Sequence, residues 1–490
     1  MRRLRNESGV AMVTVLFIAS VLTVVASTAA FVTVQEFRSS ADDRRAGRAL
    51  ATAEAGVDRT MLWLRSFQLP YKEIVFSGCT FGGVQYPTQG PFTVVGGLRV
   101  ITLSGTVASG ETYTATVRPE DGVCPTTMPS PKQPFAMEIE STGSIPTAVR
   151  KVRQEITIEG RDLPVGLSAG AVDANGNANF NGMSLLSAGP INGRSTIAFA
   201  GIDPWYERSD FYPCAANPSF CVAEDGDNIG DMPAAAHSAD RIYLNGGRVE
   251  HPPNPNCNAN RGIPAQSVWD GDISGVPESS YTSACTDQYG RPPTSRFTPA
   301  DHSRLVSTPR LSAADHQYFK SIAQTSGVYC DYRTGTGAPC TRYQSATGSV
   351  SNINIGPRFI TSEVSGIGNY YVVYIEFSPT SNPFANSNII EWEAVLPACS
   401  TSNPSSNGMA IVIVNHGSFR FRGGSRITGA LFAEDGLVDA AGNYTVEGTV
   451  IAREVRLRGT PTYLMTQCWI DLLPGPFMTV RAGRWTEVDR

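Results

Sequence analysis

The sequence predicts an α+β fold in which a long N-terminal helix lies on a β-sheet and is followed by a mainly-β region. Three observations predict it. Residues 10–34 contain no charged side chain, 47 Gly and 33 Pro favour short strands and turns, and short aliphatic segments recur every 19 residues within 408–459. A chain of 490 residues is too long to fold around one ordinary hydrophobic core, so two or more domains are expected.

The charge balance argues against a nucleic-acid partner. The chain carries 44 acidic and 39 basic residues, which gives a net charge of −5 at pH 7. No long run of like charge suggests an interaction tail. We therefore expect no nucleic acid among the partners.

The uncharged segment is long enough to cross a bilayer. Residues 10–34 read VAMVTVLFIASVLTVVASTAAFVTV, which as a helix would reach roughly 37 Å; a hydrocarbon core is about 30 Å thick. Arg2, Arg3 and Arg5 precede it, which predicts a cytoplasmic N-terminus. We expect a single pass through the cytoplasmic (inner) membrane, membrane lipid as a partner, and an extracytoplasmic location for the rest of the chain.

The helix is expected to continue into water, so that a transmembrane and amphipathic helical segment covers 10–68 and ends near Phe67. Apolar residues recur at helical spacing and form one stripe: Ala46, Leu50, Ala53, Val57, Met61 and Leu64. Pro70 ends the run. The second half of the helix should pack on a globular domain.

The N-terminus resembles that of a known family. The basic leader MRRLRNESG ends in Gly9 and precedes the apolar helix, a layout that resembles the class III leader of type IV pilins. The stretch RRAGRALATAEAGVDRTMLWLRS, with its Ala-Glu-Ala element, resembles the corresponding region of PilX-type pilus assembly proteins. This resemblance implies that 1–9 is a prepilin leader, cut at the Gly9–Val10 bond by a prepilin peptidase, and that other pilin or pseudopilin subunits are partners.

The fifth residue after that bond departs from the family pattern. Most pilins carry Glu there, whose carboxylate is thought to neutralise the N-terminal ammonium of a neighbouring subunit, whereas this chain has Thr14. An unpaired ion in an apolar filament core is costly. The departure therefore favours a minor pilin over the repeating major subunit.

Two other interpretations of the apolar segment stay open. A secretory signal peptide would end at the small residues 26–29, and a plain single-span anchor would leave the chain uncleaved. The first residue of the mature protein separates the three: Val10 for a prepilin, Ala30 or a near neighbour for a signal peptide, and Met1 for an anchor.

Residues 69–165 are expected to form a pilin-like β domain on the helix. Strands are predicted over 92–105, with a Gly-Gly turn, and over 111–119. Two more strands are predicted in 135–160, around a turn at Ser141-Thr142-Gly143. The family plan implies that this sheet is antiparallel and packs against the apolar stripe.

The C-terminal repeats predict a short parallel β-solenoid, with an antiparallel meander as the alternative. Segments 410–414, 429–433 and 448–452 recur with a spacing of 19 residues, and each is followed by another short strand. A period of about 20 residues suits one coil. Residues 166–201 have a similar pattern of short strands and Gly- and Asn-containing turns. We therefore expect a solenoid-like domain made of 166–201 and 406–470, a Cys- and Pro-rich insertion at 202–405, and a C-terminal tail at 471–490.

Within that insertion one helix and two strands are expected. Ser312 can cap the helix, Asp315 sits in its first turn, and Gly327 ends it. Residues 369–377 and 388–396 are strand-like. The insertion otherwise has the composition of a loop-rich unit held by disulfides.

The cysteines favour disulfides outside the cytoplasm. Their number is even, all ten follow the apolar segment, and none forms a C-x-x-C pair. Order along the chain suggests nearest-neighbour pairing, although sequence leaves the connectivity open: Cys79 with Cys124, Cys214 with Cys221, Cys257 with Cys285, Cys330 with Cys340, and Cys399 with Cys468.

No catalytic constellation stands out, so we expect neither enzyme activity nor a cofactor. The five His are scattered, and H-E-x-x-H and phosphate-loop patterns do not occur. Calcium is the one metal considered. Asp225, Asp227 and Asp231 are weak candidates in the acidic segment EDGDNIGD, whereas DANGNANFNG (173–182) lacks the Gly and Glu of an EF-hand.

These features predict a type IV pilus minor pilin-like structural and assembly protein, whose large extracytoplasmic β-rich domain caps the filament, adheres or contacts partners. A type II secretion pseudopilin-like component shares the leader and often the missing Glu. A membrane-anchored β-helix surface protein that binds or cleaves polysaccharide is the other alternative. It would present a line of acidic and basic residues along one solenoid face, and we identify no such line in the sequence.

Overall fold

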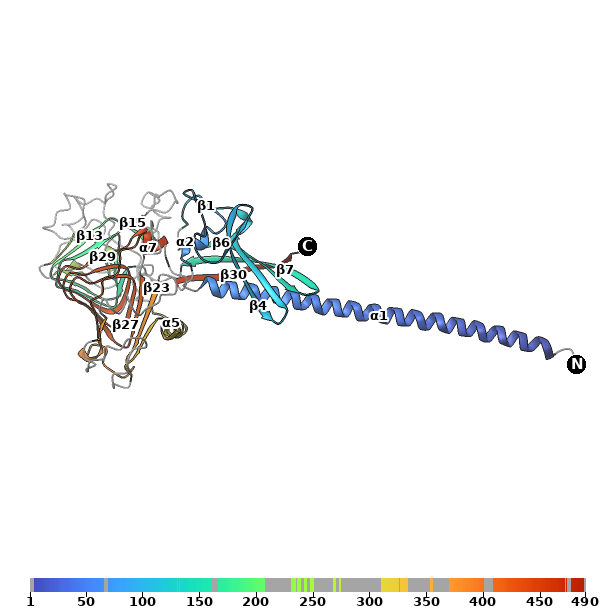
Figure 1. The fold of residues 1–490 in the computed structure, drawn as a ribbon. Helices are drawn as coiled ribbons and strands as arrows, with labels where there is room; N and C mark the ends of the chain where they lie inside the picture. Colours follow the sequence, from blue (N-terminus) through green and yellow to red (C-terminus); the bar gives the residue numbers. More distant parts are fainter. Residues whose placement is uncertain are drawn as a thin grey trace.

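The structure, a computed structural model, has three parts that follow one another along the molecule (Figure 1). A long helix, α1 (Leu4–Leu64), carries the N-terminus, an antiparallel sheet lies on its second half, and a large parallel sheet occupies the far end. The structure describes residues 4–65, 69–129, 131, 133–160, 166–207, 231–234, 236–238, 242–244, 247–250, 268–269, 273–274, 310–325, 327–333, 353–355, 370–400, 409–471, 473 and 477–488.

Six strands form the antiparallel sheet. Their order is β3 (Phe92–Val95), β4 (Leu98–Ala108), β5 (Glu111–Pro119), β6 (Phe135–Ile145), β7 (Ala148–Gly160) and β30 (Met478–Val488). Short elements beside them are α2 (Tyr71–Val75), β1 (Thr80–Phe81), β2 (Val84–Gln85) and η1 (Glu120–Gly122). The Gly-Gly turn is present, since Gly96 and Gly97 link β3 to β4 with φ of 60° and 86°.

The turn predicted at Ser141-Thr142-Gly143 is wrong. These residues lie inside β6, and Pro146 and Thr147 make the turn to β7. Gly143 is needed in the strand because α1 lies directly against it: a Cβ there would overlap the carbonyl oxygen of Ala49 and the nitrogen of Ala53. A glycine within a strand thus marks a close approach of two backbones.

The C-terminus returns to the antiparallel sheet. β30 pairs with β7 from Met478 opposite Gly160 to Val488 opposite Lys151. Residues 478–488, which were expected within a C-terminal tail, are therefore an edge strand. It follows that the long segment between residues 160 and 478 is inserted between two neighbouring strands of one sheet.

The described residues contribute 20 strands to the parallel sheet. They are β8 (Leu167–Ala169), β9 (Val172–Ala174), β10 (Ala178–Asn181), β11 (Leu185–Ser187), β12 (Ile191–Gly193), β13 (Thr196–Ala200), β16 (Ala236–Ser238), β17 (Ile242–Leu244), β18 (Arg248–Glu250), β19 (Val268–Trp269), β20 (Ile273–Ser274), β21 (Val328–Asp331), β22 (Ile353–Ile355), β23 (Tyr370–Glu376), β24 (Ile389–Trp392), β25 (Met409–Asn415), β26 (Ser418–Phe421), β27 (Arg426–Ala440), β28 (Thr445–Leu457) and β29 (Thr462–Leu464). Other elements are β14 (Ile202–Glu207) paired with β15 (Asp231–Pro233), α5 (Ala313–Thr325), η4 (Asn386–Asn388) and α7 (Gln467–Asp471).

The strand pairing follows the sequence repeat. Ala410 pairs with Gly429, and Gly429 pairs with Gly448, each time in parallel. These residues are 19 apart, so the pairing excludes the antiparallel meander for this region. The stacked backbones approach so closely that a Cβ on Gly448 would overlap the carbonyl oxygen of Gly429.

Segments far apart in sequence are neighbours in the parallel sheet. β28 pairs with β8 and β9, and β29 pairs with β10, so the C-terminal strands stack directly on the first ones. β16 to β20 extend the sheet at one end, and β21 to β24 extend it at the other. Residues 202–405 were expected to be an insertion that projects from the sheet. Most of the strands in their described part, β16 to β24, instead belong to the sheet.

An aromatic stack crosses the junction between the first and last strands. It consists of Phe421, Tyr444, Tyr463, Phe180 and Phe199, with successive ring centroids between 4.3 and 5.7 Å apart. All five side chains are buried. Burial raises the pKa of the Tyr444 and Tyr463 hydroxyls, which are hydrogen-bonded to each other. The two distant parts of the chain therefore share one core.

The helix predicted after Ser312 is present as α5. The Ser312 hydroxyl accepts a hydrogen bond from the Asp315 N–H at 3.2 Å, and the Asp315 carboxylate accepts one from the Ser312 N–H at 3.1 Å. This reciprocal pair is a capping box. α5 packs against β21 and β23 and buries Phe319 and Ala323.

We predict that Gly448→Ala destabilises the parallel sheet. Gly448 has φ of 128° and no room for a Cβ, so we expect a loss of about 2 kcal/mol or more and a lower midpoint of thermal unfolding. Gly424→Ala is the matched control, because a Cβ there meets nothing within 4 Å. Scanning calorimetry of the two variants is the measurement, and equal midpoints would contradict this account of the stacking.

Candidate functional site

The candidate site is the first half of α1, which is apolar and uncovered. Residues 12–39 are all exposed, and the exposed fractions of Met12 and Phe37 reach 68% and 71%. By length and composition this helix could cross a membrane. Soluble proteins rarely leave so large a contiguous apolar surface in water, so the surface requires lipid or a partner.

The hydroxyl groups in this half are satisfied within the helix. Five of them donate to a carbonyl one turn earlier at 2.8 to 2.9 Å: Ser20 to Phe17, Thr23 to Ala19, Ser27 to Val24, Thr28 to Val24, and Thr33 to Ala29. A donor left unpaired in hydrocarbon would cost several kcal/mol. These five residues therefore present almost no unsatisfied polar group to lipid or to a neighbouring helix.

The second half of α1 is buried on the antiparallel sheet, but the buried face is rotated from the predicted stripe. Ala53, Val57 and Leu64 of that stripe are buried, whereas Ala46, Leu50 and Met61 are only half-buried. Small and hydroxyl residues complete the buried face: Ala49, Thr52, Gly56 and Thr60. A pattern of large apolar residues alone does not find such a face.

Those small residues let the helix approach the sheet closely. A Cβ on Gly56 would lie 2.8 Å from the Tyr113 ring and would overlap the Ser141 hydroxyl. The buried hydroxyls of Thr52 and Thr60 donate to the carbonyls of Arg48 and Gly56 at 2.8 and 2.7 Å, so their burial leaves no donor unpaired. The helix is thereby fixed to its own subunit by shape.

A compact joint connects the end of α1 with the parallel sheet. The Tyr71 N–H donates to the Leu473 carbonyl at 3.0 Å, and the Lys72 ammonium lies 2.9 Å from the Asp471 carboxylate. The Tyr318 hydroxyl of α5 donates to the Arg65 carbonyl at 3.4 Å. Contacts from α2 and from α5 thus hold the parallel sheet against the C-terminal end of α1.

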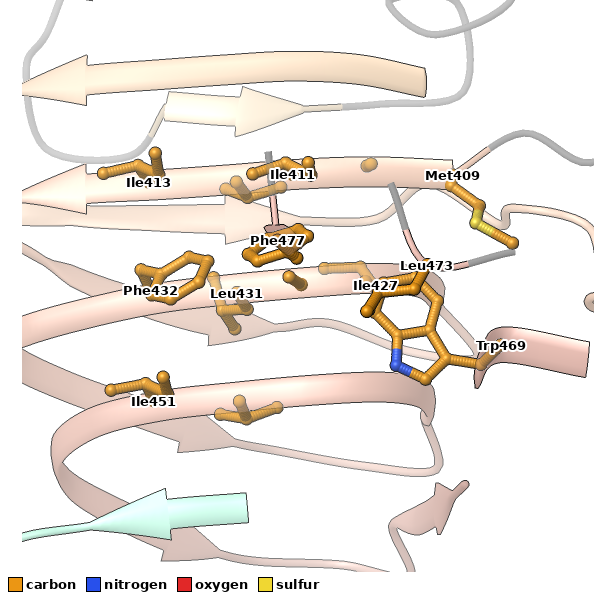
Figure 2. Close-up of a cluster of buried hydrophobic side chains, with 14 of the residues drawn as sticks. Met409, Ile411, Ile413, Ile427, Leu431, Phe432, Ile451, Trp469, Leu473 and Phe477 are labelled. Atoms are coloured by element: carbon orange, nitrogen blue, oxygen red, sulfur yellow. The ribbon is translucent and has the colours of Figure 1, made fainter. Parts of the chain in front are cut away.

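Apolar packing completes the joint. Figure 2 shows Trp469, Leu473 and Phe477 lying beside β25 and β27, which carry Ile411 and Phe432. All five are buried, and the Phe477 and Phe432 ring centroids are 6.1 Å apart. Both faces of these strands are therefore covered, which explains their nearly continuous apolar sequence.

A buried carboxylate and a disulfide lock the segment that returns to the antiparallel sheet. Glu447, 2% exposed, accepts hydrogen bonds from the Cys399 N–H at 3.0 Å and the Thr466 hydroxyl at 2.8 Å, and it pairs with Arg426. Cys399 is bonded to Cys468 in α7. These groups fix the direction in which the chain leaves the parallel sheet.

The structure places some of the predicted site residues. Gly9 and Val10 lie within α1, and Thr14 lies in its exposed half. Cys79–Cys124 and Cys399–Cys468 are disulfides, two of the pairings suggested by order along the chain. Cys330 is also disulfide-bonded; Cys214, Cys221, Cys257, Cys285 and Cys340 lie outside the described residues.

The structure describes one of the three calcium candidates. Asp231 lies in β15, and Asp225 and Asp227 lie outside the described residues. Within the part of the chain that the structure describes, no group of three or more His, Cys, Asp or Glu is placed to hold a metal ion.

Two of the scattered histidines converge on one bend of β27. His316 of α5 lies 3.0 Å from the Tyr374 hydroxyl and 3.4 Å from the Glu434 carboxylate, while His416 lies 2.8 Å from Asp435. Burial raises the pKa of Tyr374. The group ties α5 to the parallel sheet, and sequence reasoning missed it because the pairs are 19 or more residues apart.

Strand register also aligns a row of charged residues that sequence reasoning missed. In order across five strands they are Glu391, Arg420, Asp439, Arg456 and Asp173. Arg420 bonds to Glu391 at 3.3 Å and to Asp439 at 3.2 Å. Such a line was not identified from the sequence, because Asp173 comes from a strand at the other end of the parallel-sheet sequence.

Comparisons with known proteins give a distant structural likeness and no family. No family model matches the chain, and no curated protein matches it. Among solved structures it resembles the competence-associated pilin ComZ from Thermus thermophilus, with 12% sequence identity and a TM-score of 0.24 over 90% of this chain and 97% of that one. So low a TM-score does not establish a shared fold, and the function is therefore argued from the chain's own residues.

We predict that Gly143→Ala loosens α1 from its sheet. The added Cβ would overlap the backbone of α1, so we expect a loss of about 2 kcal/mol or more and faster trypsin cleavage at Arg59. Gly47→Ala is the control, because nothing lies within 4 Å of a Cβ there and helix propensity should improve by up to about 1 kcal/mol. Limited proteolysis and thermal unfolding measure both, and unchanged protection of Arg59 in Gly143→Ala would refute the close contact.

Proposed function

We propose that this chain is a minor pilin-like structural and assembly protein, which α1 first holds in the cytoplasmic (inner) membrane and later joins to a type IV pilus. One observation carries the proposal. α1 is a single helix whose first half is exposed and apolar and whose second half is buried on the subunit's own sheet. A helix that served only its own subunit would not need that uncovered extension, which requires an apolar environment.

The same surface suits both lipid and a filament. Lipid chains and apolar side chains solvate it about equally, so helices associate there through packing and not through a hydrophobic driving force. Small residues such as Ala26, Ser27, Ala29 and Ala30 allow close approach of a second helix. The Ser27 hydroxyl is hydrogen-bonded within the helix, so it adds no desolvation cost.

Processing and position in the filament are part of the proposal. A prepilin peptidase cuts the Gly9–Val10 bond, and the mature subunit then presents Thr14 where most members of the resembled family present Glu. Without that carboxylate the subunit is poorly suited to repeat along a filament, because a neighbour's ammonium would stay unpaired. It therefore acts as a minor subunit.

The parallel sheet is proposed to be a β-solenoid that the subunit displays outside the membrane. The parallel pairing at a 19-residue offset and the close glycine contacts support this. The sheet lies at the end of the molecule away from the N-terminus (Figure 1), a position suited to filament capping, adhesion or contact with partners. The remaining cysteines are proposed to pair as 214–221, 257–285 and 330–340.

The proposed role is structural and not enzymatic, and two alternatives remain distinguishable. A type II secretion pseudopilin-like component would share α1, and deletion of the gene would then stop protein secretion while pili still form. The row of charges favours the second alternative, a membrane-anchored β-helix that binds polysaccharide.

We predict that Gly9→Leu leaves an uncleaved precursor in the membrane fraction. The peptidase acts after Gly in the family that the leader resembles, and a bulky side chain at that position should block it. Ser8→Ala, next to the bond, is the control and should mature normally. N-terminal sequencing of membrane-extracted protein is the measurement; a Gly9→Leu protein that still begins at Val10 would show that the leader is assigned wrongly.

We predict that Thr14→Glu changes how the subunit enters a filament. The new carboxylate can pair with a neighbour's ammonium, so the variant should be incorporated along the fibre more often than the parent, while Thr14→Gln should not. Immunogold counting on sheared pili provides the readout. Equal incorporation of the three proteins would mean that position 14 carries no positional information.

A further inference from the structure

One outward face of the parallel sheet carries arginines on alternate strands. β26 and the residue after it supply Arg420 and Arg422, β28 and the residue after it supply Arg456 and Arg458, and Arg194 follows β12. Residues two apart along a strand point to the same face. We call these five residues the arginine row.

Backbone hydrogen bonds keep the row in register beyond the strand ends. The N–H groups of Arg422, Arg458, Asn175 and Arg194 donate to the carbonyls of Trp392, Ala440, Leu457 and Ala174 at 2.8 to 3.0 Å. The strands between the arginine-bearing ones contribute Asp439 with Ala441 and Asp173 with Asn175. The arginines therefore repeat every second strand, which corresponds to about 9.6 Å at the usual strand spacing.

Buried carboxylates hold the guanidinium groups in place. The side chains of Glu391 and Asp439 are 7% exposed, whereas those of Arg422 and Arg458 are 44% and 49% exposed. Arg422 pairs with Glu391, which raises the pKa of the guanidinium, and Arg458 lies 3.6 Å from Asp439. The two carboxylates lie beneath the guanidinium groups, so the remaining N–H donors of the two arginines face solvent. These donors are held in a fixed orientation before any ligand binds.

We propose that the arginine row binds a linear acidic polysaccharide with a carboxylate on every second sugar. Guanidinium groups bind carboxylates through paired N–H donors, and their two-strand repeat is close to the length of a disaccharide. Asp173 and Asn175, which lie between them and are joined by a 3.0 Å hydrogen bond, can bond the hydroxyls of the intervening sugar. This inference does not depend on the proposed role of α1.

The same face is poorly suited to nucleic acid. Phosphates follow one another every ~3.4 Å along a strand of a DNA duplex, much closer than the arginines. Binding of single strands uses aromatic rings that stack on successive bases. Among the described residues that strand pairing aligns with Glu391, Arg420, Asp439, Arg456 and Asp173, Tyr243 is the one aromatic residue.

The experiment uses the full chain in detergent micelles and measures binding by biolayer interferometry. Hyaluronan carries a carboxylate on alternate sugars, polygalacturonate on every sugar, and dextran on none; a single-stranded oligonucleotide is the nucleic-acid probe. Hyaluronan should bind most tightly. The variant Arg194→Gln/Arg422→Gln/Arg458→Gln should bind it at least about tenfold more weakly, because charged hydrogen bonds are lost. Arg150→Gln/Arg481→Gln/Arg484→Gln, on β7 and β30, should leave hyaluronan affinity unchanged.

Other outcomes overturn the proposal. It is wrong if hyaluronan does not bind, if dextran binds as tightly, if the oligonucleotide binds more tightly, or if both triple variants lose affinity equally. Glu391 and Asp439 both keep Arg420 in the first triple variant, so its unfolding midpoint should be retained. Should that variant fail to fold, Arg194→Gln alone decides: its side chain has no ion pair among the described residues, and it should weaken binding about threefold.

Discussion

The pairing of β30 with β7 is the constraint on which the rest of the fold depends. The chain leaves the antiparallel sheet at Gly160 and re-enters it opposite that residue, at Met478. A parallel sheet that grew in one direction would carry its last strand away from its first by about 4.8 Å per strand. Instead the chain lays its first strands in the middle, and β28 and β29 come back to stack on β8, β9 and β10.

This closure brings buried side chains from both ends of the parallel-sheet sequence together at the junction of the first and last strands. The aromatic stack passes from Tyr463 to Phe180 without a break, and Glu447 with the Cys399–Cys468 disulfide fixes the returning segment nearby. The chain connects the parallel sheet to the antiparallel sheet twice, at residues 160 and 478. Together with the Lys72–Asp471 ion pair they resist rotation about either connection.

Sequence predicts the features that depend on neighbours in the chain. The turn at Gly96-Gly97, the cap at Ser312 and the 19-residue register each have a local cause, and each is present. Gly143 was misread because the residues that require it, Ala49 and Ala53 of α1, lie 90 or more residues earlier in the chain. The row of charged residues could not be found for the same reason: Asp173 lies next to Arg456 only because β9 pairs with β28, and no local sequence pattern predicts that pairing.

The two halves of α1 make contacts of different kinds. Inside the subunit, Ala49, Gly56 and Gly143 bring backbones together, so that contact depends on shape and tolerates no added atom. Outside, large side chains such as Phe17 and Phe37 cover the helix, and these are solvated equally well by lipid or protein. The first contact is therefore specific in shape, whereas the second can be exchanged at little cost. The proposed transfer of α1 from a bilayer to a fibre would for this reason leave the helix attached to the domain it carries.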